Sequence, residues 1–177
     1  MKTSAAYLCP YPLLTVWNYF SKLGTLNNMK QQLALCFLAF FIVATSFAQK
    51  KENEAITKLL NTYKSKIEML DTVGIVALFV PQSKVIEQGK DEGTIGHYLE
   101  HHLGPELKEF KAFKFNNYKV DINVIGNYAY TNESYGYNIT TKDGKETKSL
   151  GQATSIMQKI KGEWKIVQSH SSFRRAK

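Results

Sequence analysis

The sequence predicts an α+β domain, with helices first along the chain and an antiparallel sheet after them. Residues 53–70 place apolar side chains at helical spacing, with Lys and Glu between them. From Phe113 onwards the pattern changes to an alternation of apolar and polar residues, which is typical of strands. An Asp-Gly pair at residues 143–144 supplies a hairpin turn in this second half.

Two further helices are expected before the sheet. A short one covers residues 73–80 and ends at Pro81, because proline has no backbone N–H to donate. Thr94 can cap the other, over residues 95–110, in which Pro105 must bend the helix or begin a new one.

The remaining segments are expected to be strands. A short strand over residues 83–90 lies between the second and third helices. The sheet itself is expected over residues 115–126, 127–140, 146–160 and 163–173.

The N-terminal part of the chain has the pattern of a secretory signal peptide. After Met29, a lysine precedes an apolar run and then Ser46-Phe47-Ala48, a small-x-small cleavage site before Gln49. We expect the mature protein to be secreted or periplasmic, with no stable membrane insertion after cleavage, because the apolar run is too short to favour a span. The chain would then divide into a start-site extension, a signal peptide and the folded domain, at residues 1–28, 29–48 and 49–177.

Composition excludes several classes of function. Cys9 and Cys36 both precede the expected cleavage site, so the mature protein would have no disulfide, thiol nucleophile or thiolate metal site. The full chain carries a net charge of +8, but its lysines are scattered among Glu and Asp. This distribution argues against a nucleic-acid interface, which needs basic residues clustered on one element.

The last expected strand carries the most specific motif, GEWKIVQSHSS, over residues 162–172. With this motif and the order of elements above, residues 53–175 resemble the nuclear transport factor 2-like superfamily, and within it the SnoaL-like and polyketide-cyclase-like branch of secreted bacterial proteins. The resemblance implies three N-terminal helices packed in a curved antiparallel sheet, forming a cone-shaped barrel with an apolar cavity. It also implies a small-molecule ligand and pairing of the open sheet face in a homodimer.

Three of the four histidines fall within six residues. On a helix His97 and His101 share one face, and His102 shares another with Tyr98. These histidines could lie on the surface, line the cavity as polar or proton-transferring groups, or bind Zn or Cu if His170 supplied a third ligand. The pattern leaves open whether His101 or His102 faces the cavity.

His170 is the strongest single candidate for chemistry. Simple alternation puts it on the same strand face as Trp164 and Ile166, where a curved sheet would turn toward its cavity. A neutral imidazole there could act as a general base or acid, or it could be a core histidine satisfied by a neighbouring hydroxyl. Candidate companions are Glu87, Glu133, Tyr128, Tyr130, Tyr135 and Tyr137.

We therefore expect a protein that binds a small apolar or carbonyl-bearing molecule, with acid–base chemistry from His170 and His101 and without a cofactor. The other residues expected to contact the ligand are His97, His102, Tyr98, Glu87, Tyr130, Trp164 and Arg174. One alternative is a non-enzymatic protein that binds Zn or Cu through the same four histidines. Another is a dimerising structural module.

Overall fold

The computed structural model describes residues 28–177. The chain divides into two compact units, Met1–Ser46 and Phe47–Lys177. A long helix, α2 (Asn28–Glu68), begins in the first unit and ends in the second. The expected start-site extension lies almost entirely outside the described residues, and cleavage of the signal peptide stays a prediction. Within the described part of the chain, no helix combines the length and apolarity needed to cross a membrane.

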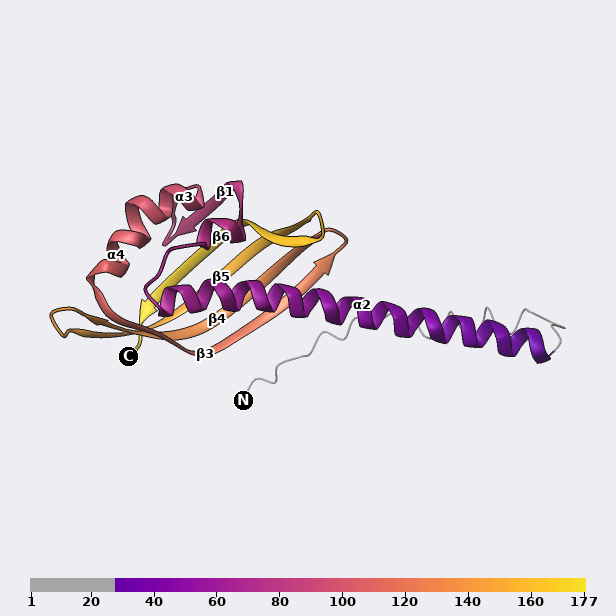
Figure 1. Ribbon diagram of the computed structural model, residues 1–177. Coiled ribbons are helices and arrows are strands. Elements are labelled where there is room, and N and C mark those ends of the chain that lie inside the picture. Colours follow the sequence, from indigo (N-terminus) through magenta and orange to yellow (C-terminus); the bar gives the residue numbers. More distant parts are fainter. Residues whose placement is uncertain (1–27) are drawn as a thin grey trace. The chain divides into compact units, whose positions relative to one another are not determined.

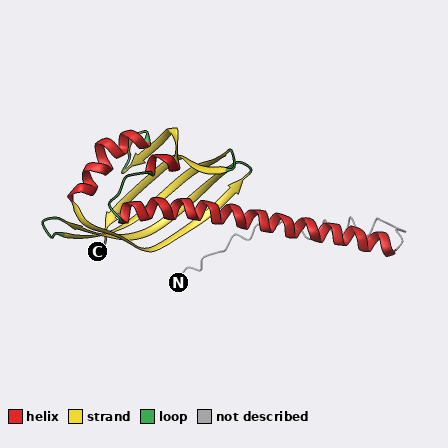
Figure 2. Ribbon diagram, viewed as in Figure 1, coloured by secondary structure: helices red, strands yellow, loops and turns green. Residues whose placement is uncertain are grey.

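The Phe47–Lys177 unit contains a curved, open sheet of six strands in the order β2-β1-β6-β5-β4-β3 (Figures 1 and 2). Its strands are β1 (Phe79–Glu87), β2 (Lys90–Gly93), β3 (Phe110–Ile125), β4 (Tyr128–Thr141), β5 (Glu146–Ile160) and β6 (Glu163–Arg175). Neighbouring strands are antiparallel except β1 and β6, which run parallel. The predicted α+β class is confirmed. The sheet departs from the expected one in its parallel pair, in β2, which was not expected, and in β1, which replaces the strand expected over residues 83–90.

The helices cover the concave face of this sheet. Ile56, Leu60 and Ile67 of α2 recur at helical spacing and are buried in one core with Met157 of β5 and Ile166 of β6. Figure 1 shows the domain part of α2 lying across the strands and α3 (Ile95–Tyr98) close to β1. A second short helix, α4 (Gly104–Glu109), leads into β3.

The expected helix over residues 73–80 is only one 3-10 turn, Ile75–Leu78. Phe79 already begins β1 and pairs with Ile166, and the register with β6 is broken from there until Lys84. Pro81 lies in this interval. Because proline has no N–H, it fits a stretch of strand that forms no regular ladder.

The expected helix over residues 95–110 is interrupted by a π-helical turn, Leu99–Leu103, just before Pro105. The N–H of Gly104 donates to the carbonyl of Leu99, five residues earlier. A side chain at Gly104 would lie 2.2 Å from that carbonyl oxygen, so the turn requires glycine there. Pro105 then occupies the first turn of α4, where its missing N–H costs nothing.

Strand β6 contains a one-residue bulge that decides which side chains reach the interior. Ile166 pairs with Met157, and Gln168 pairs with the adjacent Ile156, so Val167 has no partner on β5. Side-chain direction alternates along a strand, and a bulge shifts that alternation by one residue. The strand therefore presents odd-numbered residues to the concave face from Ser169 onwards.

Candidate ligand-binding site

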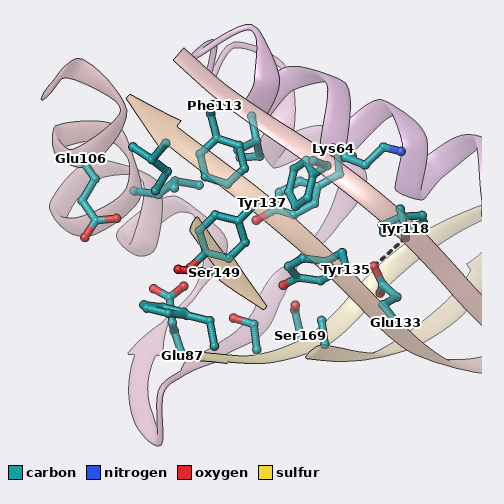
Figure 3. Close-up of a pocket in the computed structure, with 18 of the residues that line it drawn as sticks. Lys64, Glu87, Glu106, Phe113, Tyr118, Glu133, Tyr135, Tyr137, Ser149 and Ser169 are labelled. Atoms are coloured by element: carbon teal, nitrogen blue, oxygen red, sulfur yellow. Dashed lines mark hydrogen bonds between the residues drawn. The ribbon is translucent and has the colours of Figure 1, made fainter. Parts of the chain in front are cut away.

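The concave face and the helices enclose a cavity of about 300 Å³ within the Phe47–Lys177 unit (Figure 3). Its wall is mainly aromatic and includes Tyr63, Phe113, Phe115, Tyr118, Tyr135 and Tyr137. These rings pack against one another. Phe113 stacks on Tyr137 at a centroid distance of 5.1 Å, and Phe115 meets Tyr135 edge-on at 5.2 Å. Aromatic pairs of this geometry stabilise each other, so the wall is largely pre-formed.

Alternation along β4 places Tyr135 and Tyr137 in the cavity. Ala129 and Thr131, of the same parity, are buried in the core beneath them. Tyr135 lies directly over Gly151 of β5, where an added Cβ would come within 2.3 Å of the tyrosine ring. The missing side chain at Gly151 thus makes room for the Tyr135 ring.

Glu133 provides one carboxylate of the cavity. Tyr118 donates a hydrogen bond of 2.7 Å to its Oε2, and the hydroxyls of Thr131 and Ser155 donate to its Oε1 at 3.2 and 3.3 Å. All three donors are neutral hydroxyls. The carboxylate is therefore oriented by the sheet but not neutralised by these contacts.

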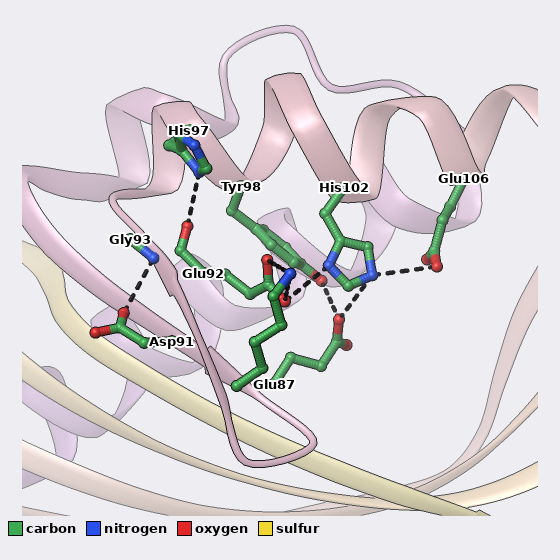
Figure 4. Close-up of polar contacts among 9 residues, drawn as sticks. Glu87, Asp91, Glu92, Gly93, His97, Tyr98, His102 and Glu106 are labelled. Carbon is green, nitrogen blue, oxygen red and sulfur yellow. Dashed lines mark hydrogen bonds and ion pairs between the residues drawn. The ribbon is translucent and has the colours of Figure 1, made fainter.

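Glu87, at the end of β1, provides a second carboxylate (Figure 4). Tyr98 of α3 donates to its Oε2 at 3.0 Å, and the Nε2 of His102 lies 3.5 Å from the same oxygen. Nε2 is also 3.2 Å from Glu106 Oε1, while Nδ1 is 3.1 Å from Glu92 Oε1. His102 thus lies among three carboxylates, two of which also line the cavity.

Burial and charge shift the protonation of this cluster. Burial raises the pKa of Glu87, although the Tyr98 hydrogen bond and His102 oppose the shift. Burial lowers the pKa of His102, but the carboxylates of Glu92, Glu106 and Glu87 outweigh it and raise the pKa overall. The hydrogen bond from Lys90, and then that from His102, holds the pKa of Glu92 below its usual range. The cluster therefore favours a charged imidazole beside a carboxyl that protonates more easily than usual.

The other two histidines of the HYLEHH segment lie away from the cavity wall. His97 bonds through Nδ1 to the backbone oxygen of Glu92 at 3.0 Å and lies against Gly93. The side chain of His101 is 58% exposed, and its nearest acid is Glu100. Tyr98 lines the cavity and His102 contacts Glu87, which lines it, so His102 rather than His101 is the histidine turned toward the site.

His170 does not share a face with Trp164 and Ile166, and that expectation is wrong. The bulge at Val167 turns His170 to the convex face, where it is exposed and lies beside Thr154 in a polar groove. Ser169 and Ser171 take the cavity positions instead. The geometry therefore gives no support to a chemical role for His170 in the cavity.

Three other candidates also lie outside the cavity wall. Tyr130 is on the convex face of β4 and is 41% exposed. Trp164 is buried in the core and donates through Nε1 to Glu52 at 2.7 Å. Arg174 is exposed and lines a separate shallow groove.

The four histidines do not assemble a metal centre. The rings of His97 and His101 are tilted to each other with centroids 4.5 Å apart, but His170 lies on the far face of the sheet. Among the residues that the structure describes, no three His, Cys, Asp or Glu side chains are placed to hold a metal ion. The spacing of the helical pair was compatible with a metal, but the sheet does not bring the third ligand to it.

The candidates drawn from the sequence omitted several residues of the cavity, notably Tyr63, Phe113 and Tyr118. A signal for Tyr118 was present, since it shares the alternation of Val120 and Ile122, both partly buried against the core. Phe113 changes parity relative to Tyr118 because the register of β3 with β4 shifts between residues 116 and 119. The sequence does show this shift, since the apolar positions change from odd numbers at Phe113 to even numbers from Tyr118 onwards.

Comparisons with known proteins agree with this architecture. A model of the family described as SnoaL-like domain matches residues 56–176. A nuclear transport factor 2-like superfamily protein from Salmonella enterica serovar Typhimurium superposes with a TM-score of 0.63 at 24% identity, covering 70% of this chain and 92% of that one. No curated protein matches the sequence.

Two other solved structures are similar in fold. A proposed scytalone dehydratase from Novosphingobium aromaticivorans has a TM-score of 0.65 and 17% identity, over 75% of this chain and 89% of its own. A proposed ketosteroid isomerase from Shewanella frigidimarina has a TM-score of 0.59 and 22% identity, over 67% and 94%. At these identities the likeness shows the fold alone, and a shared fold does not imply a shared reaction.

Proposed function

Since the chain belongs to the SnoaL-like domain family, we propose that it binds a small molecule with an apolar body in the cavity, and that Glu87 exchanges a proton with this ligand. The observation that carries the proposal is the aromatic cavity of about 300 Å³ with Glu87 in its wall. Concave, mainly apolar sites with a few convergent polar groups are the usual form of a small-molecule site.

Glu87 has the properties that proton exchange requires. Burial raises its pKa, which brings the carboxyl closer to neutral pH, where a general acid or base works best. Tyr98 fixes one of its oxygens, and His102 lies beside it within the carboxylate cluster. His102 acts here as a positioning residue, because it reaches the cavity through Glu87. We thus assign to Glu87, positioned by His102, the acid–base role that the sequence led us to expect of a histidine.

A blocking substitution tests whether the cavity is the binding site. Ser171 lines the cavity, while its neighbour Ser172 is exposed on the opposite face of β6. We expect 4-tert-butylphenol to raise the Tm of the wild type and of Ser172→Phe, because a ligand that binds only the folded state stabilises it. Ser171→Phe should lose this response. Equal responses in the two variants would place the phenol elsewhere and refute the cavity as the site.

The absorption of 4-nitrophenol tests whether Glu87 contacts the acidic proton of a ligand, as proton exchange requires. A phenol that donates a hydrogen bond to Glu87 keeps its proton, so the phenolate absorption should fall when wild-type protein is added. Glu87→Gln removes the carboxylate with little change of shape and should reduce this fall, while Ser172→Phe should retain it. If Glu87→Gln binds nitrophenol with an unchanged spectral response, Glu87 does not exchange the proton.

We further propose that the domain acts outside the cytoplasm, after removal of residues 29–48, and that it pairs with a second copy. The chain has no cysteine after residue 36, which is compatible with an oxidising compartment outside the cytoplasm.

An exposed apolar surface on paired strands supports pairing with a second copy. It is contiguous and consists of Ile125, Tyr128, Tyr130 and Ile156. Analytical ultracentrifugation should give a dimer for the wild type and a monomer for Tyr130→Lys. If the wild type is also a monomer, the pairing proposal is refuted.

A further inference from the structure

We infer that the cavity recognises an organic cation, a protonated or quaternary amine carried on an apolar body. This rests on the proposed function, because it names the class of ligand that the same cavity takes. Neither the fold nor the net charge of the chain suggests it. The charges and ring faces that line the cavity indicate a cation instead.

The cavity is acidic within a basic protein. Its lining includes Glu87, Glu106 and Glu133 but only one basic residue, Lys64. The chain as a whole carries a net charge of +8. An acidic interior is thus a property of this site and not of the composition.

The lysine does little to neutralise the glutamates. The Nζ of Lys64 lies 4.4 Å from the centroid of the Tyr118 ring, and in Figure 3 it points away from Glu87 and Glu106. None of the ion pairs among the described residues includes Glu133, whose partners are the hydroxyls described above. His102 compensates Glu87 and Glu106 only at the other side of the cavity. One carboxylate therefore faces the cavity without a cationic partner in these contacts.

The pKa values of three tyrosines in the cavity wall reflect the negative charge of Glu87 and Glu133. Burial raises the pKa of Tyr63 and Tyr135, and the carboxylates of Glu87 and Glu133 raise both further. Burial and Glu87 also contribute to a pKa of about 12 for Tyr137. The same field that disfavours a phenolate disfavours a ligand anion and favours a cation.

The aromatic wall offers a second form of recognition for a cation. A cation within about 6 Å of an aromatic centroid is attracted by the ring quadrupole, and desolvation strengthens the attraction. Lys64 over Tyr118 is an instance of this contact at the cavity wall. Phe113, Tyr135 and Tyr137 bring further rings to the same space, and in Figure 3 the two tyrosines lie between Glu87 and Glu133. Carboxylates and rings thus select the same ligand charge.

Three probes that share a phenol ring separate charge from shape. They are (4-hydroxyphenyl)trimethylammonium, its neutral isostere 4-tert-butylphenol, and the anion 4-hydroxybenzenesulfonate. Titration calorimetry on the purified protein should show the cation binding about tenfold more tightly than the isostere, the difference that about 1.4 kcal/mol produces. The sulfonate should bind more weakly than both.

Substitution of Glu133 supplies the internal comparison. Glu133→Gln keeps the shape and an acceptor oxygen, so it should weaken cation binding about fivefold or more while leaving the isostere unchanged. Glu163→Gln removes an exposed carboxylate outside the cavity lining and should change neither.

The outcomes distinguish this inference from the proposed function. If none of the three probes binds, the cavity is not a small-molecule site and both fail. If the isostere or the sulfonate binds as tightly as the cation, the cavity function stands and recognition of a cation is overturned. A ratio of cation to isostere affinity that Glu133→Gln leaves unchanged would overturn it equally.

Discussion

Glu52 links the domain part of α2 to strands β5 and β6, and its removal tests how much this link stabilises the fold. Its Oε1 pairs with Lys159 of β5 at 2.6 Å, and its Oε2 accepts from Trp164 Nε1 of β6 at 2.7 Å. Both partners are more than 100 residues away along the chain. Glu52→Ala would leave the indole N–H of buried Trp164 and the ammonium of Lys159 without this acceptor.

The expected cost follows from these contacts. Hydrogen bonds to a charged group contribute about 1.5–3 kcal/mol, and a buried donor left unpaired costs about 1–3 kcal/mol. Because the two effects overlap, we expect a loss of about 2–3 kcal/mol in the free energy of unfolding. For a unit of this size that corresponds to a fall in Tm of about 6–15 °C.

Glu54→Ala is the matched control. Glu54 is on the same helix, but its side chain is 68% exposed and its one ion pair, with Lys50, has a separation of 3.9 Å. Exposed pairs contribute about 0–1 kcal/mol. Thermal and urea unfolding of both variants, followed by circular dichroism, would measure the difference. If Glu52→Ala and Glu54→Ala lose the same stability, the bridge does not hold α2 to the sheet.

The effect of Glu52 should also depend on pH. The hydrogen bond from Lys159, and then that from Trp164, holds the pKa of Glu52 below its usual range. A carboxyl with a lowered folded-state pKa stabilises the fold above its unfolded pKa and loses that contribution as the pH falls through the folded value. The gap between wild type and Glu52→Ala should therefore narrow in acid. A constant gap down to the lowest pH at which the protein folds would contradict a charged bridge.

Three further predictions address the π-helical turn, the cavity charge and the leader. Gly104→Ala should destabilise the domain by about 1–3 kcal/mol in urea unfolding and displace His102, because its Cβ would collide with the Leu99 carbonyl; normal stability would show that the turn adapts. Cation affinity measured by calorimetry should fall as the pH drops through the raised pKa of Glu87, because the carboxyl protonates and the cavity loses a negative charge; Glu87→Gln should flatten this dependence, and an unchanged slope would rule out Glu87 as its source. Protein secreted from a host that carries the full gene should have the mass of a chain that begins at Gln49. A mass that corresponds to a chain still containing residues 29–48 would refute cleavage.

Periodicity predicted most of the fold because burial on one face leaves a regular mark in the residues. The alternation in β4 that places Tyr135 and Tyr137 inside is visible in the sequence, as is the helical spacing of Ile56 and Leu60. The parallel pairing of β1 with β6 is not, since no local pattern records which distant strand becomes a neighbour.

The site was less predictable because it depends on departures from regular geometry. The unpaired Val167 reverses the direction of every later side chain in β6, and no residue type marks it. The π-helical turn before Pro105 has the same effect on a smaller scale, although that proline did signal an interruption. Glu87, Tyr98 and His102 were among the candidates, but their contact depends on β1 and the helix meeting in space.

The bulge in β6 also makes this strand tolerant of the loss of one residue. With Val167 removed, Ile166 and Gln168 would follow each other and keep their partners Met157 and Ile156 on β5. Ser169 would still face the cavity opposite Ser155, and His170 would still face outward opposite Thr154. The loss of this single codon would therefore preserve the cavity wall, so the strand could change in length here without a change in the chemistry of the site.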